Sequence, residues 1–152
     1  MLPTPRKVKL VAAGAEGPTP LNAFDNALLA AGIGNLNLIR VSSILPPGCT
    51  HEADFEVPPG SLTPTAYGYL TSTEAGEEIA AAIGIGFSED DYGVIMEFEG
   101  RTGRAEAEEA VARMVRDGFA ARRKRLRDLQ VLAATHRVEH CGAVLAAAVL
   151  WY

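Results

Sequence analysis

The chain ends in the strongly apolar run Gly142-Ala143-Val144-Leu145-Ala146-Ala147-Ala148-Val149-Leu150-Trp151-Tyr152. A membrane-spanning helix needs about 20 apolar residues, and this run is much shorter. Its hydrophobic side chains are continuous and do not alternate with polar ones, which predicts a β-strand buried on both faces.

Upstream of this run we expect six further strands. The segment Ile79–Phe87 is the ambiguous one, because its alanines favour a helix whereas its alternating isoleucines and glycines favour a strand, which is our choice. Gly14–Pro18 is expected to be a turn, and the stretch from Ser42 to about Pro59 is expected to be irregular. The six predicted strands are Lys7–Ala13, Asn35–Val41, Leu62–Thr71, Ile79–Phe87, Tyr92–Glu99 and Gln130–Glu139.

Two amphipathic helices are predicted. The first runs from Pro20 to Ala31, with Thr19 as its N-cap and Gly32 as its stop signal. The second begins at Gly103 or Arg104 and continues to about Arg123. Their expected apolar stripes are Leu21, Phe24, Leu28 and Leu29 in the first helix, and Ala107, Ala110, Val111, Met114 and Phe119 in the second. Two helices far apart in sequence suggest an α+β sandwich in which each helix covers a different sheet face.

The bulk composition describes an ordinary globular chain. Its 152 residues fit a single domain over 1–152, with 48% hydrophobic and 22% charged residues. The formal net charge of −5 argues against a nucleic-acid partner, which needs a basic surface. The two cysteines, Cys49 and Cys141, lack metal-ligand spacing, so we expect a reduced, cytoplasmic protein. The apolar runs near the two ends are too short for a signal segment or a membrane helix, so no membrane segment is expected.

The pair Ser42-Ser43 stands where a predicted strand gives way to a loop that contains Pro46 and Pro47. The hydroxyl of Ser43 can attack the carbonyl carbon of Ser42, especially from a strained backbone, and shift the acyl group from nitrogen to oxygen. Elimination and hydrolysis would then leave a pyruvoyl group at residue 43. Two turn serines with local hydrogen bonds are the plain alternative.

Asp25 falls between Leu21, Leu28 and Leu29 on a helical projection, inside the predicted apolar stripe. A carboxylate in such a place needs a cationic partner. The guanidinium group of a substrate would meet this need with two parallel hydrogen bonds. A structural ion pair with a protein arginine such as Arg40 is the alternative.

Glu97 and Asn37 are the other candidates for chemistry. Glu97 lies in a strand beside the apolar face formed by Val94, Met96 and Phe98, and in a dry site its raised pKa would make it a proton donor. The alternative is a strand residue that faces solvent, and Glu99 could equally be the exposed one. Asn37, which shares a strand face with Ile39 and Val41, could stabilise an oxyanion or serve as a satisfied core amide.

Other motifs point to no further site. The run Gly32-Ile33-Gly34 follows a helix and does not precede one, so it lacks the order of a phosphate-binding loop. His51, His136 and His140 do not show zinc-ligand spacing. We therefore expect no metal site.

Several motifs in the same order resemble the pyruvoyl-dependent arginine decarboxylases. The resemblance spans nearly the whole chain, and it is weakest in the short N-terminus and in the loop from Gly48 to Pro59. It is carried by Glu16-Gly17, Thr19-Pro20-Leu21-Asn22-Ala23-Phe24-Asp25, Ala31-Gly32-Ile33-Gly34-Asn35, Asn37-Leu38, Val41-Ser42-Ser43-Ile44-Leu45-Pro46-Pro47, Pro64-Thr65-Ala66-Tyr67-Gly68-Tyr69, Ile95-Met96-Glu97-Phe98-Glu99-Gly100 and Ala146-Ala147-Ala148-Val149-Leu150-Trp151-Tyr152.

The resemblance implies a four-layer αββα sandwich of antiparallel and mixed sheets, assembled as homo-trimers or as hexamers of two trimers. It implies self-cleavage into a β chain, residues 1–42, and an α chain, residues 43–152, that begins with a pyruvoyl group made from Ser43. It also assigns roles to four side chains. Glu97 would be the proton donor, Asn37 would assist processing and catalysis, Asp25 would receive the substrate guanidinium, and Leu28 would form a pocket wall.

The activity implied by the resemblance is decarboxylation of L-arginine to agmatine and CO₂ through a Schiff base, without pyridoxal phosphate or a metal. Such agmatine would feed polyamine synthesis or acid resistance. Two alternatives stay open from the sequence. One is a pyruvoyl decarboxylase for another amino acid, and the other is an unprocessed chain that serves only as an assembly subunit.

Overall fold

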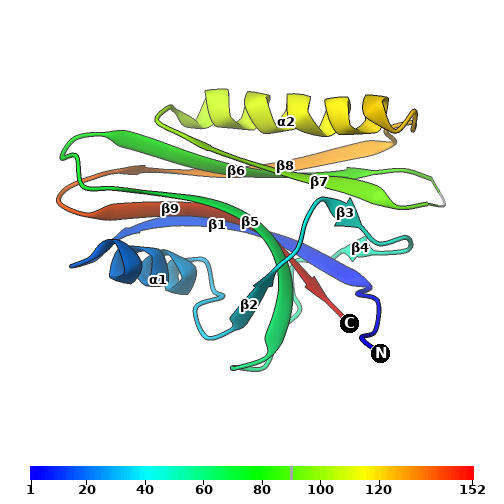
Figure 1. Cartoon of the computed structure of the whole chain (residues 1–152), viewed down its shortest axis with the longest axis horizontal. Coiled ribbons are helices and arrows are strands. Elements are labelled where there is room, and N and C mark those ends of the chain that lie inside the picture. Colours follow the sequence, from blue (N-terminus) through cyan, green and yellow to red (C-terminus); the bar gives the residue numbers. More distant parts are fainter. Residues whose placement is uncertain (90) are drawn as a thin grey trace.

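The structure is a computed structural model, and it describes residues 1–89 and 91–152. Its elements, in chain order, are β1 Lys7–Glu16, α1 Pro20–Ala30, β2 Asn37–Arg40, β3 Ile44–Leu45, β4 Thr50–His51, β5 Leu62–Ser72, β6 Glu78–Phe87, β7 Gly93–Gly100, α2 Arg104–Ala121, β8 Asp128–Arg137 and β9 Gly142–Trp151. They form four stacked layers, in the order helix, sheet, sheet, helix (Figure 1). The predicted α+β sandwich is confirmed.

The first sheet is built around β9. Its strand order is β2-β5-β9-β1-β4, and β9 pairs antiparallel with both β1 and β5. The residues of β9 from Gly142 to Leu150 are all buried. Val144 faces the core between the two sheets, whereas Leu145 faces α1 on the other side. This confirms the prediction of a strand buried on both faces, and it explains why apolar residues occupy every position of the run.

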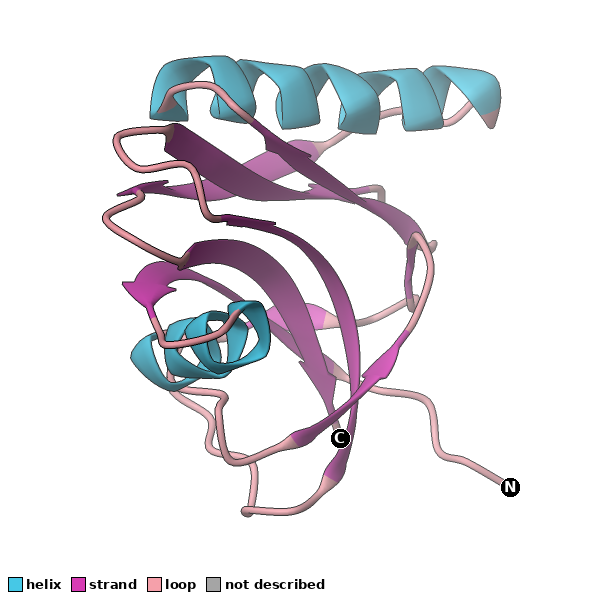
Figure 2. Cartoon of the chain, turned by 60° about the vertical axis from the view of Figure 1, so that its left-hand side comes forward, coloured by secondary structure: helices cyan, strands magenta, loops and turns pink. Residues whose placement is uncertain are grey.

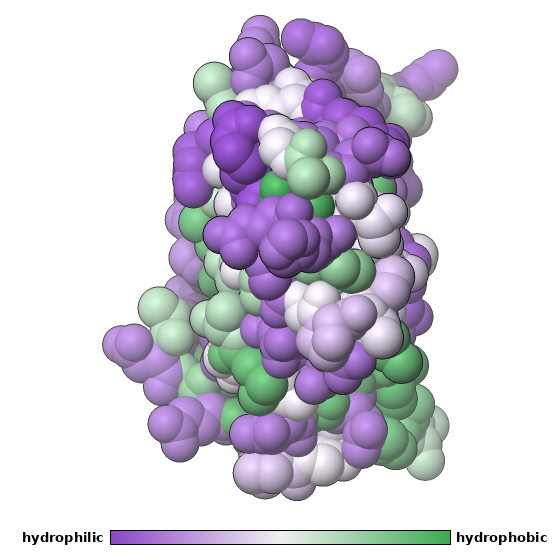
Figure 3. Space-filling view, turned by 90° about the vertical axis from the view of Figure 1, so that its left-hand side faces the viewer, coloured by the Kyte–Doolittle hydropathy of each residue, from purple (hydrophilic) through white to green (hydrophobic). Residues whose placement is uncertain are grey.

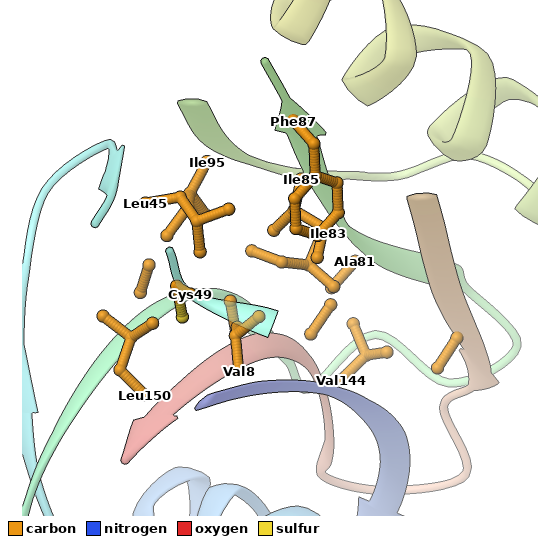
Figure 4. Packing of buried hydrophobic residues seen from close by; sticks show 14 of the residues in the cluster. Val8, Leu45, Cys49, Ala81, Ile83, Ile85, Phe87, Ile95, Val144 and Leu150 are labelled. Carbon is orange, nitrogen blue, oxygen red and sulfur yellow. The ribbon is translucent and has the colours of Figure 1, made fainter. Parts of the chain in front are cut away.

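The second sheet has the strand order β3-β7-β6-β8 and packs face to face against the first. The ambiguous segment Ile79–Phe87 is strand β6, as predicted, and Ile83 and Ile85 project from it into the core between the sheets (Figure 4). Leu45 and Ile95 lie close together in the same core. Complete burial of such a side chain stabilises the fold by about 1.5–3 kcal/mol.

Helix α1 has the predicted ends but not the predicted buried face. The Thr19 hydroxyl accepts a hydrogen bond from the Asn22 N–H at 3.1 Å, and Gly32 follows the helix with φ +82°. The fully buried residues of the helix are Ala23 and Ala27, whereas Leu21 and Leu29 are 75% and 49% exposed. The small alanines allow the helix to lie close to the sheet, so these two leucines of the predicted stripe turn outward.

Helix α2 covers the outer face of the second sheet (Figure 2). Ala107, Val111 and Phe119 of the predicted stripe are buried. Met114 is exposed, and Val115 takes its place in the contact with the sheet. The side chains of Val94, Met96 and Phe98 meet this helix, which confirms that they share one face of β7.

Two expectations about the loops are corrected. Strand β1 continues through Gly14 to Glu16, because it pairs with β9 as far as Gly142, so the predicted turn begins too early. The segment expected to be irregular after Ser42 contains two short strands, β3 and β4, each of which pairs with a longer strand. Among the helices that the structure describes, none is long and apolar enough to cross a membrane.

Candidate active site

The Ser42–Ser43 bond lies where the chain crosses from the first sheet to the second. Before the crossing, the Val41 N–H donates to the Thr65 carbonyl of β5 at 3.1 Å. After it, the Ser43 carbonyl accepts a hydrogen bond from the Ile95 N–H of β7 at 2.7 Å. Ser42 is exposed and Ser43 is half-buried. The chain is therefore anchored to the first sheet at Val41, just before the candidate cleavage site, and to the second sheet at Ser43.

The backbone at the two serines is not in the left-handed region. Among the described residues other than glycine, positive φ occurs only at Arg123. The expectation that a strained backbone assists the attack of Ser43 finds no support in this dihedral angle. The fold holds the chain by backbone hydrogen bonds on both sides of this bond.

Glu97 lies on β7 two residues beyond Ile95, and both side chains point toward the first sheet. The residue that faces Glu97 from the first sheet is Gly68 of β5. A Cβ atom placed on Gly68 would lie 3.1 Å from the Cβ of Glu97 and 2.8 Å from Oε2 of Glu99. Glu97 is thus half-buried between the sheets, and the solvent-facing alternative is wrong.

The surroundings of Glu97 favour its protonated form. Burial raises the pKa of the Glu97 carboxyl, the positive charge of Arg40 lowers it, and the negative charge of Glu99 raises it again. The net direction is upward, as the sequence predicts for a dry site. A carboxyl group with a raised pKa can donate a proton closer to neutral pH than an ordinary glutamate can.

Arg40 does not pair with Asp25, so that alternative is wrong. Its Nη2 donates to the Tyr67 carbonyl at 2.8 Å, and its guanidinium lies 4.7 Å from the centre of the Tyr67 ring. Its charge also acts on Glu97. Arg40 therefore belongs to the surroundings of the candidate proton donor.

Asp25 and Leu28 do not lie beside Ser43 in a single chain. They belong to α1, which packs on the outer face of the first sheet, whereas Ser43 and Glu97 lie on its inner side. Asp25 is exposed, so the expectation of a buried carboxylate is wrong for the isolated chain, and Leu28 is half-buried against the cluster beneath the helix.

Asn37 is also apart from the serines. It is the first residue of β2, is exposed, and its Nδ2 donates to the Gly60 carbonyl at 3.0 Å. The amide thus fixes the loop that leads into β5, and it is not a core amide. Of the residues singled out from the sequence, one chain brings together only Ser42, Ser43 and Glu97.

A hollow that the sequence did not predict lies between α1 and β5. It has a volume of about 310 Å³ and is lined by Pro20, Leu21, Phe24, Tyr67, Tyr69 and Thr71. The Phe24 and Tyr69 rings are 4.6 Å apart. The spacing of the two tyrosines was a usable signal, because residues two apart on a strand share a face.

Glu16 and His136, far apart in sequence, form another contact that sequence reasoning missed. Glu16 Oε2 lies 2.5 Å from His136 Nε2, and Oε1 accepts from the backbone N–H groups of His140 and Cys141 at 2.8 and 3.1 Å. Burial alone raises the pKa of Glu16, but these hydrogen bonds outweigh it and hold the pKa at about 2. The contact joins β1 of the first sheet to β8 of the second.

Comparison with known proteins identifies the family. Residues 7–152 match the sequence profile of the family described as pyruvoyl-dependent arginine decarboxylase. A protein of that name from Methanocaldococcus jannaschii is 49% identical over 150 residues, which cover 97% of this chain and 91% of the relative. A namesake from Pyrococcus abyssi is 43% identical over 152 residues, which cover 98% of this chain and 96% of the relative. The chain therefore belongs to the pyruvoyl-dependent arginine decarboxylase family.

Proposed function

We propose that this protein decarboxylates L-arginine to agmatine and CO₂, with a pyruvoyl group at residue 43 as its covalent cofactor. The observation that carries the proposal is the position of Ser43, which is held against β7 opposite Ile95, two residues before the half-buried Glu97. Family membership supplies the class of reaction, a carbon–carbon lyase.

The cofactor arises by self-cleavage of the Ser42–Ser43 bond. The Ser43 hydroxyl oxygen attacks the Ser42 carbonyl, and the acyl group moves to that oxygen. Elimination and hydrolysis then separate residues 1–42 from residues 43–152 and release ammonia. Each new end stays in place, because β2 remains paired with β5 and β3 with β7. The fold therefore tolerates the break.

Each group has its own part in the reaction. The pyruvoyl group supplies a carbonyl that reacts with the substrate amine and withdraws electrons as CO₂ leaves. Glu97 is the acid that delivers a proton to the substrate carbon, a role that burial favours because it raises the pKa of the carboxyl. Neither pyridoxal phosphate nor a metal is needed for this chemistry.

Substrate recognition involves a neighbouring subunit. Asp25 and Leu28 lie on the far side of the first sheet from their own Ser43, so we place them at the site of another copy within a homo-trimer or a hexamer of two trimers. There Asp25 binds the substrate guanidinium with paired hydrogen bonds and Leu28 forms part of the pocket wall. Asn37 lies apart from the serines of its own chain, and its proposed part in processing and catalysis rests on the resemblance to the family.

The exposed side chains support this assembly. Large hydrophobic residues remain exposed on α1 and on β2 and β5 of the first sheet, namely Leu21, Leu29, Ile39, Leu62 and Tyr69. At the end of the sandwich seen in Figure 3, hydrophobic side chains are more frequent in the lower half, over the first sheet and α1. Contact between copies would bury such a surface.

We also place the protein in the cytoplasm. Its two cysteines, Cys49 and Cys141, are buried and free, and burial raises the pKa of the Cys49 thiol to about 11. Buried thiols that stay unpaired suit a reducing compartment.

Intact-mass analysis joined to a product assay tests the proposal. We expect two fragments split after Ser42, the larger with a blocked, carbonyl-bearing N-terminus, and agmatine formed in step with CO₂ from arginine. An unbroken chain of full mass would exclude the enzyme, and the alternative of an unprocessed assembly subunit would then apply. Fragments that act on another amino acid and not on arginine would disprove the substrate alone.

A further inference from the structure

The carbonyl oxygen of residue 43 has a fixed hydrogen-bond donor. The Ile95 N–H donates to it at 2.7 Å and extends the antiparallel pairing in which Ile44 lies opposite Val94. N–H groups along an antiparallel strand point alternately to its two neighbours. The N–H of Ile95 therefore points to β3, and that of Met96 points to β6.

This donor is rigidly held. Strand β7 lies between β3 and β6, and the Ile95 side chain is completely buried beside Leu45 in the core between the sheets (Figure 4). A donor fixed in this way needs no reorientation when charge develops on its acceptor, and such donors contribute strongly to catalysis.

We propose that the backbone N–H of Ile95 is a catalytic donor that stabilises negative charge on the carbonyl oxygen of residue 43, both when the pyruvoyl group is made and when it is used. This inference rests on the proposed function, because the oxygen acquires that charge only if residue 43 is converted.

The first use is in maturation, after the acyl shift has placed the acyl group of Ser42 on the Ser43 oxygen. The Cα–H bond of residue 43 breaks and its proton passes to water. The electron pair forms a double bond to Cβ, and the Cβ–Oγ bond breaks with its electron pair leaving on the new Ser42 carboxylate. As the proton leaves, charge at Cα spreads to the adjacent carbonyl oxygen, where the Ile95 N–H stabilises it.

The second use is in decarboxylation. When the bond to the substrate carboxylate breaks and CO₂ leaves, the electron pair would move toward residue 43. The amide carbonyl of residue 43, which is distinct from the ketone that takes the substrate amine, would be conjugated with the reacting carbon. Its oxygen would then carry part of the charge until Glu97 protonates that carbon. Strand β7 thus carries both the donor, at Ile95, and the acid, at Glu97.

The first test needs no substitution. In the cleaved protein labelled with ¹⁵N-isoleucine and ¹³C-carbonyl serine, the hydrogen bond predicts a scalar coupling between the Ile95 nitrogen and the carbonyl carbon of residue 43. Detection of this coupling supports the inference. Its absence in fully cleaved protein would show that the donor is lost before catalysis and would overturn the second use.

The second test replaces the Ile95 amide by an ester, which deletes the N–H and keeps the side chain. The matched control carries the same replacement at Met96, which removes a hydrogen bond toward β6. We expect the Ile95 variant to cleave about 10²-fold more slowly and to accumulate the ester between Ser42 and Ser43. Hydroxylamine splits this ester and the engineered ester, and the masses of the fragments, cut after residue 42 or after residue 94, tell the two apart. Decarboxylation per cleaved site should fall by a similar factor in single-turnover measurements, whereas the control stays near the unaltered protein.

The outcomes separate the inference from the proposed function. If the unaltered protein cleaves and decarboxylates arginine but the two ester variants behave alike, only the inference fails. If the unaltered protein forms no pyruvoyl group, both fail. Circular dichroism checks folding of the variants, and if the Ile95 ester does not fold, the coupling measured in the unaltered protein decides.

Discussion

Gly68 of β5 faces Glu97 of β7 across the space between the two sheets. A Cβ atom on Gly68 would lie 3.1 Å from the Glu97 Cβ and 2.8 Å from Glu99 Oε2. Real side chains rarely approach so closely, so the bare backbone at Gly68 provides the room that both acidic side chains occupy. The geometry of the candidate proton donor therefore depends on a residue of the opposite sheet.

Gly68→Ala should displace Glu97 and slow decarboxylation by roughly 10²-fold, the effect expected for a misplacement of about 1 Å. Cleavage after Ser42 should continue, because the anchors of that bond are the Thr65 carbonyl and the Ile95 N–H. The two rates would be compared by intact mass and by agmatine formation. A loss of both in a folded variant would contradict this division.

Ser43→Ala should remain uncleaved and inactive, because it lacks the hydroxyl that attacks the Ser42 carbonyl. Ser42→Ala is the matched control, since it removes the neighbouring hydroxyl but keeps the nucleophile. Electrophoresis and intact mass report cleavage, and phenylhydrazine labelling reports the pyruvoyl group. Cleavage in Ser43→Ala, or a carbonyl label on it, would refute the assignment.

Glu97→Gln should cleave normally but decarboxylate about 10²- to 10⁴-fold more slowly, since it cannot supply the proton. Because the pKa of Glu97 is raised, its charged form opposes folding, and this cost appears as pH rises through that pKa. The variant should therefore be at least as stable as the parent at alkaline pH in thermal unfolding. Near-normal turnover would remove Glu97 as the acid.

Removal of either of two charges near Glu97 should shift the pH profile of kcat, and the two shifts should be in opposite directions. If the protonated carboxyl is required, activity falls as pH rises through its pKa. Glu99→Gln removes a negative charge, lowers this pKa and moves the alkaline limb to lower pH, whereas Arg40→Gln moves it to higher pH. Profiles of kcat for the two variants measure the shifts, and movement in the same direction would contradict the model of the site.

Asp25→Ala should raise the KM for arginine by about 10- to 100-fold, the cost of losing a charged hydrogen-bond partner. Cleavage should be unaffected, since α1 lies on the other side of the first sheet from its own serines. Asp25→Asn keeps the shape of the side chain but not its charge, so its KM for arginine should lie between those of the parent and the alanine variant. An unchanged KM in the assembled oligomer would disprove the role of Asp25.

Glu16→Gln should destabilise the fold by about 1–3 kcal/mol at neutral pH, because the carboxylate receives bonds from His136, His140 and Cys141. The pKa of Glu16 is held at about 2, below its ordinary 4.5, so its contribution is present above pH 4.5 and disappears as pH falls toward 2. Denaturant unfolding against pH measures the difference. Glu139→Gln, in the same turn, is the control and should have little effect.

The sequence by itself determined the elements that depend on local pattern. The unbroken apolar run predicted β9, the Thr19-Pro20 and Gly32 signals predicted both ends of α1, and the alternation of Val94, Met96 and Phe98 predicted β7. It also singled out Ser43 and Glu97, because their chemistry and motif order are visible along the chain.

Only the tertiary structure decided which of these residues meet. The contact surface of α1 formed around Ala23 and Ala27, which allow the helix to lie close to the sheet, so Asp25 turned outward against the expectation. Strand register and the stacking of the two sheets bring three pairs together, namely Gly68 with Glu97, Glu16 with His136, and Ile95 with Ser43. Such pairs are far apart in sequence, and no local periodicity records the distance between two layers. The sequence therefore determined the reactive groups, and the packing of the two sheets determined the geometry in which they act.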